Sequence, residues 1–172
     1  MPCSWDIEHI DSQTDNEIKD KKTQNDWIQT SMQNLKDYTD VEFTDKEQSR
    51  INDFLNSSTG DNFEEIQKMI AAKAGEVSVE DNAHLKNSLG NLTLLDSGTN
   101  RSYGNALFVT KRRRIINEDK AGTFVPLGTK NVFLKYFDEK VPSLLQWTVD
   151  DMQNYQNDIV NTIKEYLTEK AE

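Results

Sequence analysis

The chain has 172 residues, enough for one domain with a hydrophobic core. Charged residues make up 29% of it, which is typical of a soluble globular protein rather than a disordered one. No apolar run approaches the roughly 18 residues that span a bilayer, and no signal peptide is recognisable. The single cysteine, Cys3, excludes an intrachain disulfide and a zinc site built on several thiolates. We therefore expect a cytoplasmic protein without a membrane partner.

Charge is distributed unevenly along the chain. The formal net charge of −10 argues, taken alone, against nucleic acid as a partner. Residues 1–82 hold 19 acidic and 8 basic residues, whereas residues 83–172 hold 11 acidic and 12 basic ones. The segment 101–114 carries five basic residues and no acidic one. The average therefore hides a basic segment that suits a polyanion.

The first predicted element is a short strand at residues 3–10, "CSWDIEHI". Side chains alternate between the two faces of a strand, so Trp5 and Ile7 share one face and Asp6 and Glu8 share the other.

Residues 15–82 have the periodicity of three amphipathic helices. We expect the first to be capped by Thr23, the second by Thr44 with Glu47 in capping-box spacing, and the third to end near Gly75. This acidic segment has no cluster of metal ligands, so we interpret it as a packing subdomain. Its negative surface could also repel DNA or face another domain.

A second short strand is predicted at residues 89–95, "LGNLTLL", and the remaining elements follow it. The turn-rich "DSGTNRSYGN" leads into a helix, and a short helix follows an irregular passage. The last helix is the clearest, because Thr148 is a cap with Asp151 three residues on, and its long apolar stripe is more typical of core than of interface.

Three segments together resemble the HNH (His-Me finger) nucleases: "WDIEHI" at 5–10, "GNLTLL" at 90–95 and "TNRSYGN" at 99–105. In particular they resemble the C-terminal nuclease domain of GmrSD-type modification-dependent restriction proteins. The resemblance implies a single α+β, mainly helical domain built on a ββα-metal finger. Its expected parts are strand 3–10, a helical insertion at 15–82, the finger strand and helix at 89–120, and a C-terminal helical part at 129–172.

Phosphodiester hydrolysis needs an activated water and a sink for negative charge. Histidine, with an ordinary pKa of about 6.5, can accept a proton at neutral pH. Mg²⁺ prefers oxygen ligands and keeps several waters, so Glu8 and Asn100 would form a sufficiently sparse set. Because Glu8 and His9 are adjacent, an ideal strand would point them to opposite faces. The hypothesis therefore requires a bend just after Glu8.

The resemblance also implies a role for each matched residue. His9 is implied as the general base and Glu8 as the metal-binding acid, with one Mg²⁺ or Mn²⁺ ion. Asn100 matches the metal-binding asparagine, and Asn91 matches the asparagine that braces the histidine loop. Asp6 is implied as a partner of these groups. Asn105 is the alternative metal ligand.

The basic segment is expected to contact DNA phosphates. Its residues would spread around a helix, so only one or two of them can face DNA at once. The alternative is a solvated helix face. The phosphate-binding candidates are Arg101, Lys111, Arg112 and Arg113.

The predicted function is that of a metal-dependent DNA endonuclease domain in restriction or anti-phage defence. The resemblance implies a C-terminal fragment of a longer protein, with an N-terminal ParB-like nucleotide-hydrolysing domain as its partner. The alternative, favoured by the net charge of −10, is an inactive HNH-like acidic module that mimics nucleic acid or binds an immunity-type partner.

Overall fold

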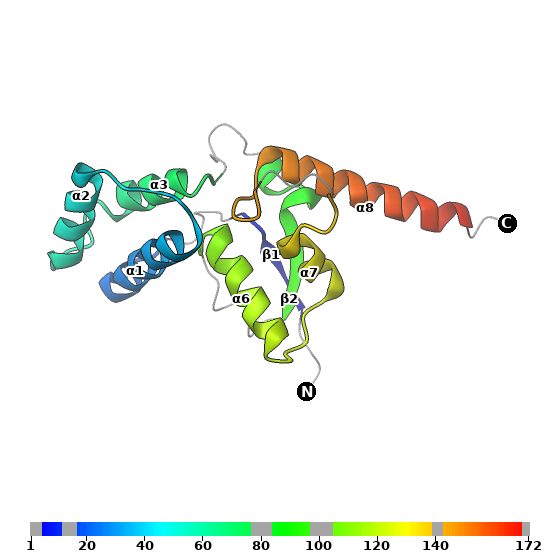
Figure 1. Ribbon diagram of the computed structural model, residues 1–172, viewed down its shortest axis with the longest axis horizontal. Helices are drawn as coiled ribbons and strands as arrows, with labels where there is room; N and C mark the ends of the chain where they lie inside the picture. Colours follow the sequence, from blue (N-terminus) through cyan, green and yellow to red (C-terminus); the bar gives the residue numbers. More distant parts are fainter. Residues whose placement is uncertain (1–4, 12–16, 77–83, 97–104, 139–142, 170–172) are drawn as a thin grey trace.

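The computed structural model describes residues 5–11, 17–76, 84–96, 105–138 and 143–169. These contain six α-helices of at least eight residues, one short 3₁₀ helix and one two-stranded antiparallel sheet, which confirms the mainly helical α+β class. The helices α1 to α3 gather at one end of the molecule, the sheet lies in the middle, and α8 projects from the other end (Figure 1). None of the described helices has the length and hydropathy needed to cross a membrane.

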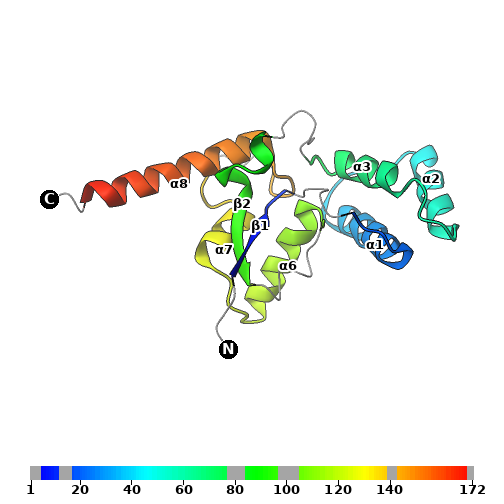
Figure 2. The ribbon, with the colours of Figure 1, turned by 180° about the vertical axis from the view of Figure 1, so that it is seen from behind.

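The sheet joins two segments that are far apart in the sequence. Strand β1 (Trp5–His9) pairs antiparallel with β2 (Leu92–Asp96), and the two lie side by side in Figure 2. The predicted second strand therefore exists, but it begins three residues later than expected. The residues before it form the 3₁₀ helix η1 (Leu89–Asn91).

The helical insertion consists of α1 (Lys21–Tyr38), α2 (Asp45–Asn56) and α3 (Phe63–Lys73). Their apolar faces form one core with residues at the start of α6, as expected from the helical periodicity. The largest buried members are Ile28, Leu35, Ile51, Phe54, Phe63, Ile66, Ile70 and Leu107.

Local signals place the ends of these helices. The expected capping box of α2 is confirmed, because Thr44 and Glu47 exchange side-chain-to-backbone hydrogen bonds. The chain leaves α3 through Gly75 at φ +75°, as predicted for its end. Thr23 was the wrong cap for α1: the Asp20 carboxylate accepts the Thr23 N–H at 2.8 Å, so the helix starts earlier.

The inner face of the sheet packs against α6 (Phe108–Lys120) and α7 (Leu127–Leu134). This second core is rich in aromatic residues and closes around the buried Trp147. Its buried members are Ile10, Leu95, Phe108, Ile115, Val125, Val132, Phe133, Trp147 and Met152.

Helix α8 (Val149–Glu169) is only partly in contact with the rest of the chain. The predicted cap is confirmed: Thr148 and Asp151 exchange hydrogen bonds at 2.7 and 3.2 Å. Met152 is buried, but Leu167 is 63% exposed and the distal half extends away from the body (Figure 1). The expectation that the whole apolar stripe lies in the core was therefore wrong for its C-terminal half.

Gly90 allows η1 to pack directly on α8. A Cβ atom at this position would overlap the backbone carbonyl of Met152. Only glycine, which has no side chain, fits at this position of the "LGN" segment. The close approach places the next residue, Asn91, next to the end of β1.

Candidate active site at the end of strand β1

The two faces of β1 differ in burial. Asp6 and Glu8 lie on the face turned towards α6, and Glu8 is buried. The opposite face carries Trp5 and Ile7, and Ile7 is 66% exposed. The predicted division of side chains is confirmed, and the acidic face is the one that packs inward.

His9 lies on the outward face, still within the regular strand. It pairs with Leu92 in the ladder, and the chain bends only at Ile10 and Asp11. The bend expected just after Glu8 is therefore absent, because the ladder continues for one more residue. Consequently Glu8 and His9 point to opposite faces of the strand.

The imidazole of His9 is held by an amide that the sequence did not suggest. Its Nε2 lies 3.1 Å from Oδ1 of Asn87, and the ring is partly exposed. An amide oxygen only accepts hydrogen bonds, so this contact requires the proton on Nε2. The neutral ring then carries its lone pair on Nδ1, the form that a general base needs.

Asn91 braces the turn that follows His9. Its Oδ1 accepts the Asp11 N–H at 2.8 Å, and its Nδ2 donates to the carbonyl of Lys86 at 3.0 Å. Its own carbonyl accepts the Ile10 N–H at 2.9 Å. With an exposed fraction of 0%, this side chain fixes the backbone on both sides of the bend.

On the inward face, Glu8 is paired with Lys111 of α6. The ammonium lies 2.6 Å from Glu8 Oε1 and 2.6 Å from the His9 carbonyl oxygen. Lys111 is only 1% exposed. Its assignment to DNA phosphates was therefore wrong: the residue is a buried counter-ion that ties α6 to the end of β1.

A second buried ion pair lies just beyond the bend. Lys86 donates to Asp11 Oδ2 at 3.0 Å, and both side chains are buried. Glu76 approaches from the end of the insertion and accepts the Phe108 N–H at 2.8 Å. Burial raises the pKa of Glu76 well above its usual value, and the charge of Asp11 and a hydrogen bond with it raise this pKa further. The neutral, protonated form of Glu76 is therefore favoured more than that of a carboxyl group in water.

The remaining predicted site residues are Asn100, Arg101, Asn105, Arg112 and Arg113. Asn100 and Arg101 fall outside the described residues. The backbone carbonyl of Asn105 accepts the indole N–H of Trp27 at 2.8 Å, which fixes this buried residue towards α1. Arg112 is partly buried, which lowers its pKa, and Arg113 donates from Nη1 to a side chain of α1.

The acidic face of β1 offers the donor type that a divalent cation prefers. Asp6 and Glu8 supply carboxylate oxygens, and Mg²⁺ is usually held by only one or two such groups. Among the residues that the structure describes, no cluster of three or more His, Cys, Asp and Glu side chains could hold a metal ion. A cation at Glu8 would have to use Oε2 or displace the Lys111 ammonium from Oε1. The donor chemistry fits such a sparse site, with water and substrate completing it.

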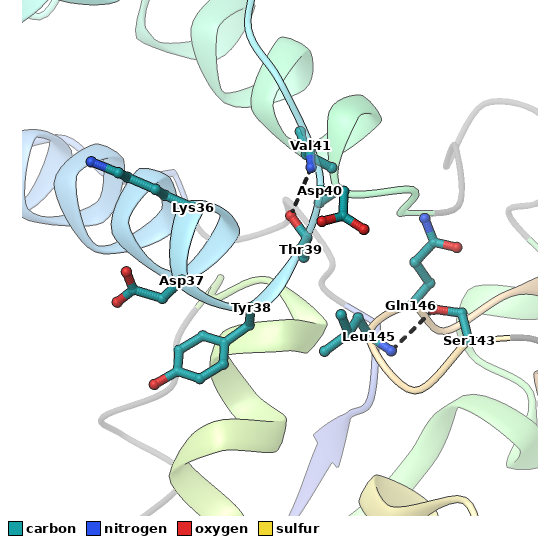
Figure 3. A pocket seen from close by; sticks show the side chains of 10 residues that line it. Lys36, Asp37, Tyr38, Thr39, Asp40, Val41, Ser143, Leu145 and Gln146 are labelled. Carbon is teal, nitrogen blue, oxygen red and sulfur yellow. Dashed lines mark hydrogen bonds between the residues drawn. The ribbon is translucent and has the colours of Figure 1, made fainter.

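A cavity of about 830 Å³ lies away from this site, between the end of α1 and the segment before α8 (Figure 3). Asp37 and Asp40 flank it on one side and Leu145 and Gln146 on the other. It contains none of the predicted site residues, and its two carboxylates outnumber its one ammonium group, that of Lys36, which disfavours a phosphate.

Comparison with known protein families gives a match. The model of the family "GmrSD restriction endonucleases, C-terminal domain" matches residues 44–162, which is more than half of the chain. The match includes Asn91 and α6 but begins after β1, so Glu8 and His9 lie outside it. No curated protein and no solved structure matches the chain significantly. The chain thus belongs to the family of GmrSD restriction endonuclease C-terminal domains, as its sequence motifs predicted.

Proposed function

We propose that this restriction endonuclease domain hydrolyses DNA phosphodiester bonds, with His9 as the general base and one divalent cation as cofactor. The observation that carries the proposal is the contact between His9 Nε2 and Asn87 Oδ1 at 3.1 Å. It supports a fixed tautomer in a partly exposed ring at the end of a strand, next to a turn braced by a buried asparagine.

In this proposal β1 and β2 are the two strands of a ββα-metal finger. Glu8 and Asn100 would hold the cation, which when bound stabilises charge on the phosphate and on the leaving oxygen. Asp6 is the alternative carboxylate on the same face.

The residues of the chain itself have three tasks in the reaction. His9 Nδ1 takes the proton from the attacking water, and Asn87 keeps the ring in the orientation that leaves Nδ1 available. Lys111 fixes the His9 carbonyl, and Asn91 fixes the turn beyond it. Because Glu8 and His9 face opposite sides of β1, a phosphate contacting both groups must lie across the end of the strand.

We further propose that the domain acts in the cytoplasm, in restriction of foreign DNA such as phage DNA. Its proposed partner is an N-terminal ParB-like nucleotide-hydrolysing domain of the same parent protein, which selects the target. A domain with a formal charge of −10 is poorly suited to find DNA unaided.

The test is nicking of supercoiled plasmid with and without Mg²⁺ or Mn²⁺. Replacing a general base typically lowers the rate by about 10² to 10⁴-fold, so we expect this loss for His9→Ala. His84→Ala is the matched control, because His84 is exposed and is the other histidine of the chain. Equal nicking by His9→Ala and wild type would contradict the proposal. An inert wild type that binds a basic protein tightly would favour the acidic interaction module instead.

Asn87→Leu separates positioning from general damage. Without the Oδ1 acceptor the ring loses its tautomer preference, so we expect a lower kcat and an altered pH profile with an unchanged KM. Asn87→Asp, which keeps an acceptor oxygen, should retain most of the activity. A merely structural role would not change the pH profile.

A further inference from the structure

A polar groove of about 520 Å³ runs between α1 of the insertion and α6. Its eight lining residues carry amide, hydroxyl or guanidinium groups, and none of them is acidic. This is unusual in a chain with 30 acidic residues and a formal charge of −10. The lining residues are Gln29, Thr30, Gln33, Asn34, Thr110, Arg113, Arg114 and Asn117.

The floor of the groove is a preformed network. Asn34 is 3% exposed and donates from Nδ2 to Thr110 Oγ1 at 2.9 Å. Its Oδ1 accepts from Arg113 Nη1 at 2.7 Å, and the guanidinium lies 4.8 Å from the centre of the Tyr38 ring. A guanidinium has five N–H donors, and the bond to Asn34 uses one of them. Arg113 is therefore held in place before any ligand arrives, which lowers the entropic cost of binding.

The rim of the groove is exposed on both helices. Gln29 and Gln33 are exposed on α1, and Arg114 and Asn117 are exposed on α6. Amide and guanidinium side chains are among the groups that contact nucleic-acid phosphates, and a guanidinium fork fits two phosphate oxygens.

We propose that the α1–α6 groove binds the phosphodiester backbone of the nucleic acid about three nucleotides from the bond that is cut. This inference rests on the proposed function and extends it to a second contact site. It gives the insertion a direct part in substrate binding, because α1 supplies one wall of the groove. The two helices lie side by side in Figures 1 and 2.

The groove lies within reach of the end of β1 because α6 contributes to both. Thr110 lines the groove, and its neighbour Lys111 contacts the His9 carbonyl oxygen at 2.6 Å. A helix with its side chains is about 10 Å across. One strand of B-DNA rises 3.4 Å per nucleotide. A strand with its scissile phosphate at His9 would therefore present phosphates to the groove after about three nucleotides.

The test is the affinity of the His9→Ala protein for a fluorescently labelled 24-base-pair duplex, measured by anisotropy across a salt series. The variant adds Gln29→Ala, Gln33→Ala and Arg114→Gln, which change exposed rim residues and leave the buried floor intact. We expect Kd to rise at least about tenfold, and the slope of log K against log salt to become shallower by about one, as for the loss of one phosphate contact. Arg50→Gln on α2 is the control, because it removes the same charge from an exposed helix outside the groove.

The outcomes distinguish a failure of the groove proposal from a failure of the proposed hydrolysis. If the rim variant keeps the Kd and salt slope of its parent, or if Arg50→Gln weakens binding equally, the groove proposal is overturned, while metal-dependent nicking by the wild type still stands. If the rim variant alone weakens binding but the wild type never nicks DNA, the groove is supported and the proposed hydrolysis fails.

Discussion

The helical insertion and the region around the sheet differ in where their ion pairs lie. In the insertion, ion pairs such as Arg50–Glu65 and Lys68–Glu64 lie at the surface, and the buried side chains that the structure describes there are uncharged. Around the sheet, three lysines are almost completely buried, and each is paired with a carboxylate. The pairs are Lys86–Asp11, Lys111–Glu8 and Lys135–Asp151.

Neither kind of ion pair is expected to add much to the free energy of unfolding, but two of the buried pairs fix the geometry of the strand end. Exposed pairs contribute little, typically about 0–1 kcal/mol, so the insertion is held mainly by its apolar core. Buried pairs cost desolvation that their attraction only partly offsets, and an apolar replacement of similar shape is often as stable. Two of the three buried pairs lie within two residues of His9, at Glu8 and Asp11. We infer that they are kept for the geometry of the strand end rather than for net stability.

The largest expected effect comes from breaking one buried pair. Lys111→Met keeps much of the side-chain volume but leaves Glu8 buried without its counter-ion, which should lower the free energy of unfolding by about 3–5 kcal/mol. Urea denaturation measures this change. Arg50→Gln, in the exposed pair of the insertion, should cost no more than about 1 kcal/mol. Equal losses for the two variants would remove the contrast between the regions.

The next effect tests whether a cation competes with Lys111 for Glu8. In Lys111→Met the carboxylate lacks its ammonium partner, so Mg²⁺ should bind more tightly and restore part of the lost stability. A ligand at 100 times its Kd adds about 2.7 kcal/mol to the stability of the folded state. Thermal unfolding with Mg²⁺ or with EDTA measures this, and the double variant Glu8→Gln, Lys111→Met is the control. A stabilisation by Mg²⁺ that persists in the double variant would place the cation elsewhere.

A smaller loss is expected from the brace of the turn. Asn91→Ala leaves the Asp11 N–H and the Lys86 carbonyl buried without their partner, which should cost about 1–3 kcal/mol. For a chain of this length, each kcal/mol lowers Tm by about 2–4 °C. Calorimetry measures the shift. Asn131→Ala on α7 is a comparison asparagine outside the site and should lower Tm by less.

The sequence predicts the local features of the helices well, but it does not predict the long-range side-chain contacts around the sheet. The capping residues Thr44 and Thr148 and the helix end at Gly75 were predictable, because those signals involve residues only a few positions apart. The pairing of the two strands was predictable from the motifs. The partners of the site were not: Asn87 is 78 residues from His9, and Lys111 is 103 residues from Glu8. Nothing local distinguishes such residues from ordinary surface ones, so only the fold reveals their contacts.

The smaller effect of a local signal can be measured at the start of α2. Thr44→Ala removes the side chain that accepts the Glu47 N–H, and the loss of such a cap costs about 1 kcal/mol. Urea denaturation should show this decrease without any change in DNA binding. Thr44→Ser keeps the hydroxyl and should behave as the wild type does. A loss in DNA binding after Thr44→Ala would mean that the insertion is coupled to the site more tightly than its packing suggests.

The substitution Glu76→Gln changes the side chain least, and its effect on the free energy of unfolding should depend on pH. Folding raises the pKa of Glu76, so above about pH 4.5 the folded state retains a proton that the unfolded state has released. Stability from this group is therefore complete below that pH and is lost as pH rises through the folded pKa. Glutamine can still accept the Phe108 N–H and donate to Asp11, so the variant should gain stability over wild type as pH rises from 5 to 8. Urea denaturation across this range measures the difference.

Glu47 in the insertion should respond with the opposite sign. Hydrogen bonds from the Thr44 backbone and from Lys73 lower the pKa of Glu47, so its stabilisation is present at neutral pH and is lost as pH falls below about 4.5. Glu47→Gln should therefore be less stable than wild type at pH 7, and the deficit should shrink in acid. If the stabilities of both glutamine variants relative to wild type change with the same sign as pH rises, folding does not raise the pKa of Glu76. The carboxylates beyond the bend would then be charged like those of the surface, and the electrostatic contrast between the two regions would rest on the lysine pairs alone.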